Sequence, residues 1–148
     1  MLEHGINIPS NKEEAIKYYK MAIDKGHASA MNNYAYSLEF GEGVPVDFEK
    51  AIEYYKIAID KGNRFSMNNY AWMLYNGKGV QSDKKEAAKY FKMAADKGHT
   101  GAMFFYAKML EYGDGIPSDM KESLKYYQMA ADNGNEKAKQ KLIYIQNF

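Results

Sequence analysis

Cysteine is missing from this chain of 148 residues. Its absence excludes disulfide bonds, a thiolate nucleophile and any metal site built on cysteine sulfur. A protein without disulfides suits a reducing compartment. The sequence therefore favours the cytoplasm as the location of the protein and leaves the organelle open.

Long apolar runs are missing too. No segment has the length of a membrane-spanning helix, and the first residues contain no basic stretch followed by an apolar one. Charge of one sign is also lacking, with 20 Lys plus Arg against 19 Asp plus Glu. A balanced chain produces no net field that would hold a phosphate backbone or an anionic membrane. We therefore expect neither nucleic acid nor a membrane as a partner.

What the chain does have is a residue pattern that recurs every 36 positions without an insertion. Four columns show the register: Gly26, Gly62, Gly98 and Gly134; Tyr18, Tyr54, Tyr90 and Tyr126; Ala22, Ala58, Ala94 and Ala130; and Leu2, Leu38, Leu74 and Leu110. A period of this length over several copies is typical of a solenoid, in which each unit buries its apolar face only against its neighbours.

The fold predicted from this period is an all-α, right-handed superhelix of helical hairpins forming one domain over residues 1–148. The expected repeats are a partial copy at 1–26, three full copies at 27–62, 63–98 and 99–134, and a capping helix at 135–148. A partner would bind along the concave surface of such an array.

Residues 47–79 illustrate one repeat. After Asp47, apolar residues spaced three and four apart predict a helix that ends at Gly62. A second apolar series, from Met67 to Leu74, predicts another helix, and the glycines at 77 and 79 suit a sharp return. The expected N-caps of the first helices are Asn11, Asp47, Asp83 and Asp119. Each repeat is thus predicted to be a helical hairpin followed by a wide loop.

The two ends of the sequence differ from the inner copies. Met1 to Gly5 lie in register with Met109 to Gly113, the end of one helix and the loop after it, so we expect the chain to begin in mid-repeat. It would then be an excised fragment or a shortened product of a longer array, and its first full helix would start at the N-cap Asn11. At the other end, Lys137, Lys139, Gln140 and Lys141 make a polar helix that suits a cap.

These motifs resemble those of the Sel-1-like repeat family, a variant of the tetratricopeptide repeat with a longer loop between its helices. The resemblance rests on Ala-x-x-Tyr-Tyr-x-x-Ala (residues 51–58), the glycine at 62, the Tyr-Ala-x-x-Leu helix and the Gly-x-Gly-Val loop, and it covers essentially the whole chain. It implies a non-enzymatic adaptor or scaffold that binds protein or peptide and needs no cofactor. Secreted bacterial members often carry a disulfide in each repeat, and this chain departs from them.

In the related tetratricopeptide fold, the helix with the Tyr-Ala-x-x-Leu pattern lines the concave face. Its positions outside the core pattern are therefore the candidate protein-binding residues: Asn32, Asn33, Tyr36, Phe40, Asn68, Asn69, Trp72, Tyr75, Phe104, Lys108 and Tyr112, with Glu39, Asn76, Phe105 and Glu111 at the same registers. Asparagine can donate to and accept from a peptide backbone at once, and large rings can anchor an interface. The alternative is that the asparagines bond between neighbouring helices.

Two other functions stay open as alternatives. One alternative is a structural spacer, or a fragment of a longer repeat protein that self-associates through its N-terminal helix. The least supported alternative is a serine enzyme that interacts with β-lactams, because Ser82 to Lys85 and Ser118 to Lys121 match Ser-x-x-Lys; the companion elements Ser-Asp-Asn and Lys-Thr-Gly do not occur. His4, His27 and His99 are too dispersed to predict a metal site and are expected to be solvated turn residues.

Overall fold

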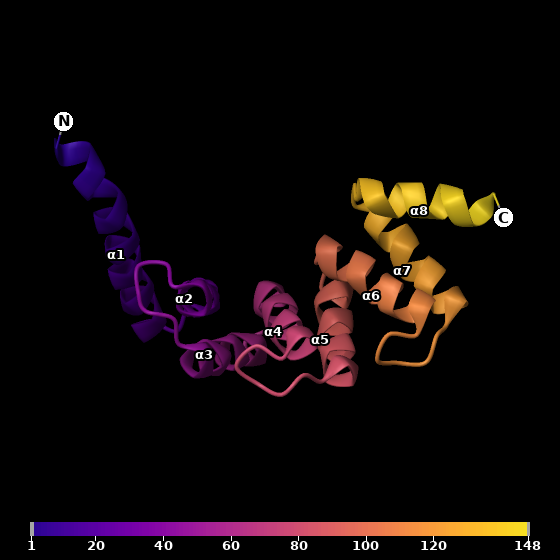
Figure 1. Cartoon of the computed structure of the whole chain (residues 1–148), viewed down its shortest axis with the longest axis horizontal. Helices are drawn as coiled ribbons and strands as arrows, with labels where there is room; N and C mark the ends of the chain where they lie inside the picture. Colours follow the sequence, from indigo (N-terminus) through magenta and orange to yellow (C-terminus); the bar gives the residue numbers. More distant parts are fainter. Residues whose placement is uncertain (1, 148) are drawn as a thin grey trace. The chain divides into compact units, whose positions relative to one another are not determined.

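The computed structural model describes the backbone of residues 2–147 and the side chains of residues 11–147. Over these residues the chain forms eight α-helices and no strand (Figure 1). They are α1 (Leu2–Asp24), α2 (Ala28–Phe40), α3 (Phe48–Asp60), α4 (Arg64–Asn76), α5 (Lys84–Asp96), α6 (Thr100–Tyr112), α7 (Met120–Asp132) and α8 (Glu136–Gln146). The all-α prediction is confirmed.

The helices belong to two compact units, Met1–Asn69 and Tyr70–Phe148, and α4 runs through the division. In the first unit α2 packs against α1 and α3; in the second, α5, α6, α7 and α8 pack each against the next. Each unit is thus a stack of helical hairpins (Figure 1). None of the helices in the described part of the chain is both long and apolar enough to cross a membrane.

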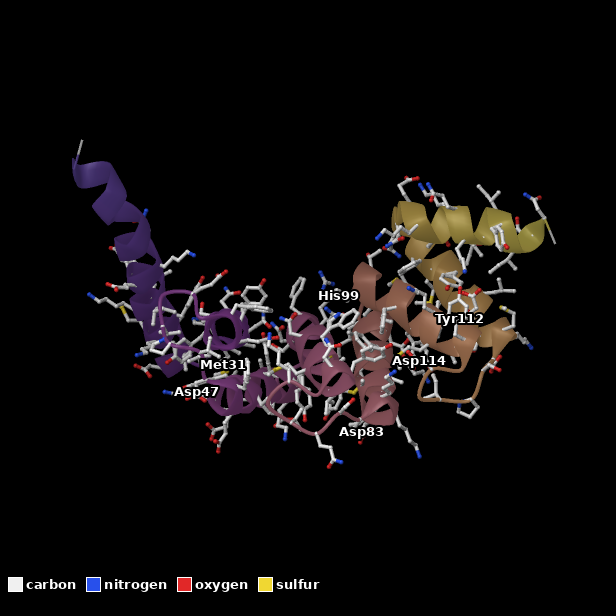
Figure 2. All side chains as sticks on the ribbon, in the orientation of Figure 1. Met31, Asp47, Asp83, His99, Tyr112 and Asp114 are labelled. Carbon is white, nitrogen blue, oxygen red and sulfur yellow. The ribbon has the colours of Figure 1, made fainter. Side chains whose placement is uncertain are left out.

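Side chains cap the starts of most helices. Asp47, Asp83 and Asp119 each accept a hydrogen bond from the main-chain N–H three residues on, at 3.0 Å. Figure 2 labels two of these residues, Asp47 and Asp83. Such a cap satisfies one of the main-chain donors that a helix start leaves unpaired. The second helices are capped similarly, by Asn63 before α4, His99 before α6 and Asn135 before α8.

The expected start of the first helix at Asn11 is wrong, because α1 runs without a break from Leu2 to Asp24. The inner copies leave the helix at a pair of glycines that both have positive φ, such as Gly113 and Gly115. At the same register the first copy has a glycine followed by Asn7, and asparagine adopts positive φ less readily than glycine. The first copy thus lacks half of the turn signal.

The loop after α6 lies directly on the start of α5. A Cβ atom added to Gly115 would stand 2.4 Å from the Cβ of Lys84, and Gly115 has a φ of +81°. Only glycine fits both the backbone angle and the space. The loop after α2 approaches α1 in the same way, at Gly43 and Lys12.

Alanines and tyrosines form the core of each unit. The alanines facing neighbouring helices are fully buried, and they include Ala35, Ala51, Ala58, Ala71, Ala87, Ala94, Ala107 and Ala130. Small residues let helix backbones approach closely. Tyrosines fill the remaining space in edge-on pairs: Tyr34 with Tyr54 at 5.0 Å between ring centroids, Tyr70 with Tyr90 at 5.0 Å, and Tyr106 with Tyr126 at 4.8 Å.

A second set of tyrosines ends in hydrogen bonds to carboxylates, one buried and one part-buried. The Tyr55 hydroxyl donates to Glu39 at 2.7 Å, and the Tyr127 hydroxyl donates to Glu111 at 2.6 Å. The partners are 16 positions apart in both pairs. Burial, reinforced by the neighbouring carboxylate, raises the pKa of both hydroxyls far above the usual value. Each bond joins the end of one hairpin's second helix to the first helix of the next.

We expect Tyr55→Phe to lower the free energy of unfolding by about 1–2 kcal/mol, because Glu39 keeps its burial and loses a hydroxyl donor. Tyr55→Ala should cost about 3–5 kcal/mol, because it also empties a fully buried site. Urea unfolding followed by circular dichroism measures both. Equal stability of Tyr55→Phe and the parent chain would contradict a stabilising role for this hydrogen bond.

Candidate functional site

Four aromatic rings gather in the second unit. Trp72 and Tyr75 come from α4, Phe91 from α5 and Phe105 from α6. The Trp72 ring lies 4.3 Å from that of Phe105 and 5.1 Å from that of Phe91, and the Phe91 and Phe105 rings are 4.8 Å apart. Phe91 is fully buried, whereas Trp72, Tyr75 and Phe105 are half-buried. We call these four residues the aromatic floor.

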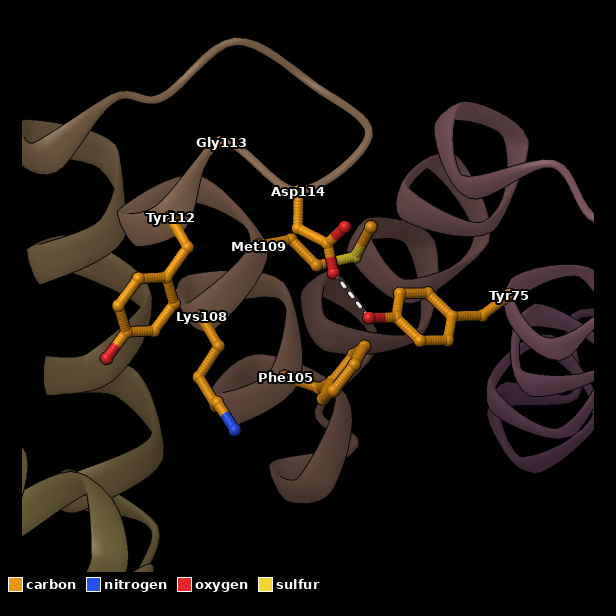
Figure 3. Close-up of a pocket in the computed structure, with 7 residues that line it drawn as sticks. All are labelled: Tyr75, Phe105, Lys108, Met109, Tyr112, Gly113 and Asp114. Atoms are coloured by element: carbon orange, nitrogen blue, oxygen red, sulfur yellow. Dashed lines mark hydrogen bonds between the residues drawn. The ribbon is translucent and has the colours of Figure 1, made fainter.

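A hollow of about 510 Å³ opens beside this floor (Figure 3). It lies at the C-terminal end of α6 and the start of the following loop. The residues lining it are Tyr75, Phe105, Lys108, Met109, Tyr112, Gly113 and Asp114. The hollow therefore combines large rings with a cation, a carboxylate and a phenol.

Asp114 ties the edge of the hollow together. Its carboxylate accepts hydrogen bonds from the Tyr75 hydroxyl (Figure 3) and from Lys84 Nζ, the latter at 3.0 Å. The Lys84 ammonium also lies over the Tyr75 ring, 4.8 Å from its centroid. The bond from Tyr75 and the bond from Lys84 lower the pKa of Asp114. Its charge is thus compensated inside the protein.

A second ion pair stands near Tyr112. Lys141 Nζ of α8 lies 3.1 Å from Glu111 Oε2 and donates to the Tyr112 hydroxyl at 2.8 Å. The hydrogen bond to Tyr112 and the contact with Glu111 raise the pKa of Lys141, against the effect of burial. The ring of Tyr112 itself remains 64% exposed. It offers a large accessible surface at the rim of the hollow.

Lys108 is held differently from the other lysines of this region. Its Nζ lies 5.8 Å from the Phe104 ring centroid and 5.9 Å from that of Phe105. Among the side chains that the structure describes, no carboxylate pairs with it. Lys108 is half-buried as a residue, its ammonium is stabilised by the two rings, and its hydrogen-bonding capacity stays open.

In the first unit, two of the predicted asparagines bond between helices. Asn32 of α2 accepts from Ser66 Oγ at 2.8 Å and from Asn69 Nδ2 at 3.1 Å, both on α4. This supports the packing alternative for Asn32 and Asn69. Asn33 is exposed and Asn68 half-buried. Asn32 and Asn33 also line a smaller hollow of about 280 Å³ with Ser29, Asn63 and Phe65.

The remaining predicted residues are aromatic. Tyr36 and Phe40 are exposed and stack on each other at 4.5 Å between centroids. Phe104 is half-buried against Tyr127, at 5.6 Å. The candidate residues thus fall into two groups. The first unit holds Asn32, Asn33, Tyr36, Phe40, Asn68 and Asn69, and the second holds Trp72, Tyr75, Phe104, Lys108 and Tyr112. Ligand binding at these residues stays a prediction.

Sequence reasoning missed Asp114 and Phe65. In every inner copy a charged residue stands between the two loop glycines, which signals an exposed loop tip. Nothing local indicates that Asp114 meets Tyr75 and Lys84, because these partners lie 39 and 30 positions away. Phe65 falls on a register occupied by serine, glycine and lysine in the other copies, so the pattern assigns it no role.

Ser82 of the first Ser-x-x-Lys match and His99 both form hydrogen bonds with the main chain. The Ser82 hydroxyl donates to the carbonyl of Tyr75 at 3.0 Å. His99 Nδ1 accepts a hydrogen bond from the Ala102 N–H at 3.0 Å, so this histidine caps α6. It is half-buried, whereas the sequence predicted a solvated residue. His27 is exposed, and His4 lies outside the residues whose side chains are described. Residues 11–147 contain no cluster of three His, Asp or Glu that could hold a metal.

The repeats match a known family of repeat sequences. The Sel1 repeat model matches residues 1–27, 28–63, 65–99 and 100–135. The crystal structure of a Sel1 repeat protein from Oxalobacter formigenes has 32% sequence identity and a TM-score of 0.81, over 85% of this chain and 51% of that one. None of the curated proteins matches this sequence.

Two further solved structures share the architecture. The protective antigen c5321 of uropathogenic Escherichia coli, which displays an SLR fold, has 28% identity and a TM-score of 0.85, over 90% of this chain and 29% of that one. Cysteine rich protein B of Helicobacter pylori has 21% identity and a TM-score of 0.71, over 88% and 94%. This chain therefore spans about half of the Oxalobacter structure and about three tenths of the Escherichia one.

The stabilising effect of Asp114 should depend on pH. Its pKa is lower in the folded than in the unfolded chain, so the stability it contributes is present above the unfolded value, near 3.8, and is lost as pH falls through the folded value. We expect Asp114→Asn to lower the Tm at neutral pH and to approach the parent Tm in strong acid. Thermal unfolding of both proteins between neutral and strongly acid pH measures this.

The matched control is Lys84→Met, which removes the cation paired with Asp114. This variant should reduce the loss of Tm that the parent protein shows between neutral and strongly acid pH. A Tm difference between Asp114→Asn and the parent that stays constant down to strong acid would contradict this role of the carboxylate.

Proposed function

The chain belongs to the Sel1 repeat family, and from this premise we propose that it is a non-enzymatic module that binds a peptide or protein segment at the hollow of its second unit. Repeat domains of this type usually act in protein binding. The chain covers only part of the solved Sel1 proteins that it resembles, so the proposal concerns this domain.

The observation that carries the proposal is the exposure of large rings around a hollow with fixed polar groups. Trp72, Tyr75 and Phe105 are only half-buried, and Tyr112 stands at the rim with most of its ring in solvent. Aromatic side chains beside a polar rim are the groups that dominate binding energy at many interfaces. Hydrogen bonds from Tyr75 and Lys141 hold the edge in place before a ligand arrives, which reduces the entropy lost on binding.

Trp72 is the only tryptophan and lies in this floor, so its emission reports on the site. Selection of a random peptide library on the folded chain should enrich peptides, and the enriched peptides should shift Trp72 emission. Enrichment without any emission shift would place binding elsewhere. A folded protein that enriches no peptide would contradict the proposed function.

Two exposed tyrosines provide a matched pair of variants. Tyr112 is 64% exposed and lines the hollow, whereas Tyr144 is 61% exposed on α8 and is not part of the lining. The Lys141 ammonium lies near both rings, at 5.1 Å and 6.0 Å from their centroids. We expect Tyr112→Ala to weaken the binding free energy of an enriched peptide by roughly 1–2 kcal/mol. Tyr144→Ala should change that binding free energy by no more than a few tenths of a kcal/mol. Titration followed by Trp72 emission measures both, and equal effects of the two variants would argue against this hollow.

Self-association is a second candidate, because α1 carries an uncovered apolar face. Tyr18 is 61% exposed and Met21 58% exposed, and both line a hollow of about 460 Å³ with Glu13, Glu14 and Lys17. At the register of Tyr18, the later copies pack Tyr54, Tyr90 and Tyr126 edge-on against the tyrosine of another helix. A helix of a second copy would offer the same kind of contact to Tyr18.

If α1 mediates self-association, sedimentation velocity should show a species whose fraction grows with protein concentration. Tyr18→Glu, which places a charge on the exposed ring position, should return the protein to a monomer without loss of helical content. A parent protein that stays monomeric over the whole accessible concentration range would rule out this second candidate.

A further inference from the structure

We propose that the hollow of the second unit selects peptides with an acidic side chain close to an apolar one, with Lys108 binding the carboxylate and the aromatic floor contacting the apolar side chain. This inference rests on the proposed function and adds the class of ligand.

The hollow lies where the chain departs from its own repeat. At the registers of Tyr55 and Glu39, the sequence also has Tyr127 with Glu111, and Tyr19 with Glu3. Only the copy at residues 63–98 differs, with Phe91 at the register of Tyr55 and Tyr75 at the register of Glu39. A buried tyrosine–carboxylate pair is thus replaced by two rings of the aromatic floor.

The next copy, residues 99–134, departs on α6. The registers of Phe104 and Phe105 hold asparagine in both earlier copies, Asn32 with Asn68 and Asn33 with Asn69. Lys108 stands where the earlier copies have Tyr36 and Trp72. The Lys108 ammonium lies near the rings of both Phe104 and Phe105, and Lys108 and Phe105 line the hollow.

The charges around the hollow favour an anion. Asp114 is paired with Lys84, and Glu111 is paired with Lys141. Lys108 is then the one cation of this group without a carboxylate partner among residues 11–147, and it leaves one net positive charge at the hollow. The Lys108 ammonium lies near two rings and keeps its N–H donors for a ligand, so a ligand carboxylate can form a charge-assisted hydrogen bond with it.

Asp114 is the group that would favour a basic ligand instead, because it lines the same hollow. Both of its oxygens already accept hydrogen bonds, one from Tyr75 and one from Lys84. A basic ligand would meet a carboxylate whose charge Lys84 already compensates, whereas an acidic ligand finds Lys108 without a carboxylate partner among residues 11–147. The geometry therefore favours the acidic peptide.

The distances also suggest a spacing within the ligand. The Lys108 ammonium lies 5.9 Å from the centroid of Phe105. In an extended peptide, side chains two positions apart point to the same side and are separated by roughly 7 Å. An acidic residue and an apolar residue with one residue between them would therefore match Lys108 and Phe105.

The test uses synthetic peptides with acetylated and amidated ends, so that the only carboxylate is a side chain. The first peptide carries glutamate and leucine separated by one residue in an alanine and serine background. The comparison peptides replace glutamate by glutamine or by lysine. We expect the glutamate peptide to bind about three- to tenfold more tightly than the glutamine peptide, and the lysine peptide to bind most weakly. Trp72 emission and calorimetry measure the affinities.

Variants of Lys108 assign the preference to a residue. Lys108→Met keeps an unbranched apolar stem over the rings and should remove the difference between the glutamate and glutamine peptides. Lys108→Arg should keep the difference. The matched control is Lys125→Met on α7, which also removes a lysine from above a ring, at 5.5 Å from the Tyr126 centroid, and should change neither affinity.

The outcomes separate this inference from the proposed function. Binding of all three peptides with equal affinity, or tightest binding of the lysine peptide, would overturn the acidic preference and leave peptide binding intact. A glutamate preference that survives in Lys108→Met would overturn the role of Lys108. Absence of binding by any of these peptides, together with an unproductive library selection, would overturn both proposals.

Discussion

The close approach of helices at alanine is the constraint on which the rest of the structure depends. Alanines such as Ala51, Ala58, Ala87 and Ala94 are fully buried between neighbouring helices. Because a methyl group takes little room, the helix axes can come near enough for the tyrosines to interlock edge-on. A larger side chain in these columns would separate the helices and break the tyrosine contacts in the same step.

This packing makes each hairpin a standard frame on which a few positions can vary. Tyr55 with Glu39 and Tyr127 with Glu111 show the same hydrogen bond in two copies. Between them, Phe91 and Tyr75 occupy equivalent positions with a different chemistry. The buried position holds a ring in both versions, since Tyr55, Phe91 and Tyr127 are all fully buried. The hollow beside Tyr75 and Phe105 is therefore lined by rings, while the helices around it keep the register of the other copies.

The sequence predicts the fold well and the site only in part, for a physical reason. Period, glycines and caps are local signals, so the hairpins and the caps at Asp47, Asp83 and Asp119 follow from short stretches of chain. The continuous helix through Asn11 could not be predicted in this way. The other copies have a turn at this register, and the first copy has only one of the two glycines that make it. Contacts such as Asp114 with Lys84, or Asn32 with Ser66, join residues 30 and 34 positions apart. They depend on how hairpins stack, which no local pattern specifies.

The cap of α6 differs from those of α4 and α8 in one respect. Asn63 and Asn135 cap with an amide oxygen, which is indifferent to acidity over the physiological range, whereas His99 caps with an imidazole nitrogen. The imidazole accepts the Ala102 N–H only through a nitrogen that carries no proton, so the bond requires the neutral ring to hold its proton on Nε2. Of these three helices, the one that bears Phe104, Phe105 and Lys108 is therefore the one whose cap depends on the tautomer of a side chain.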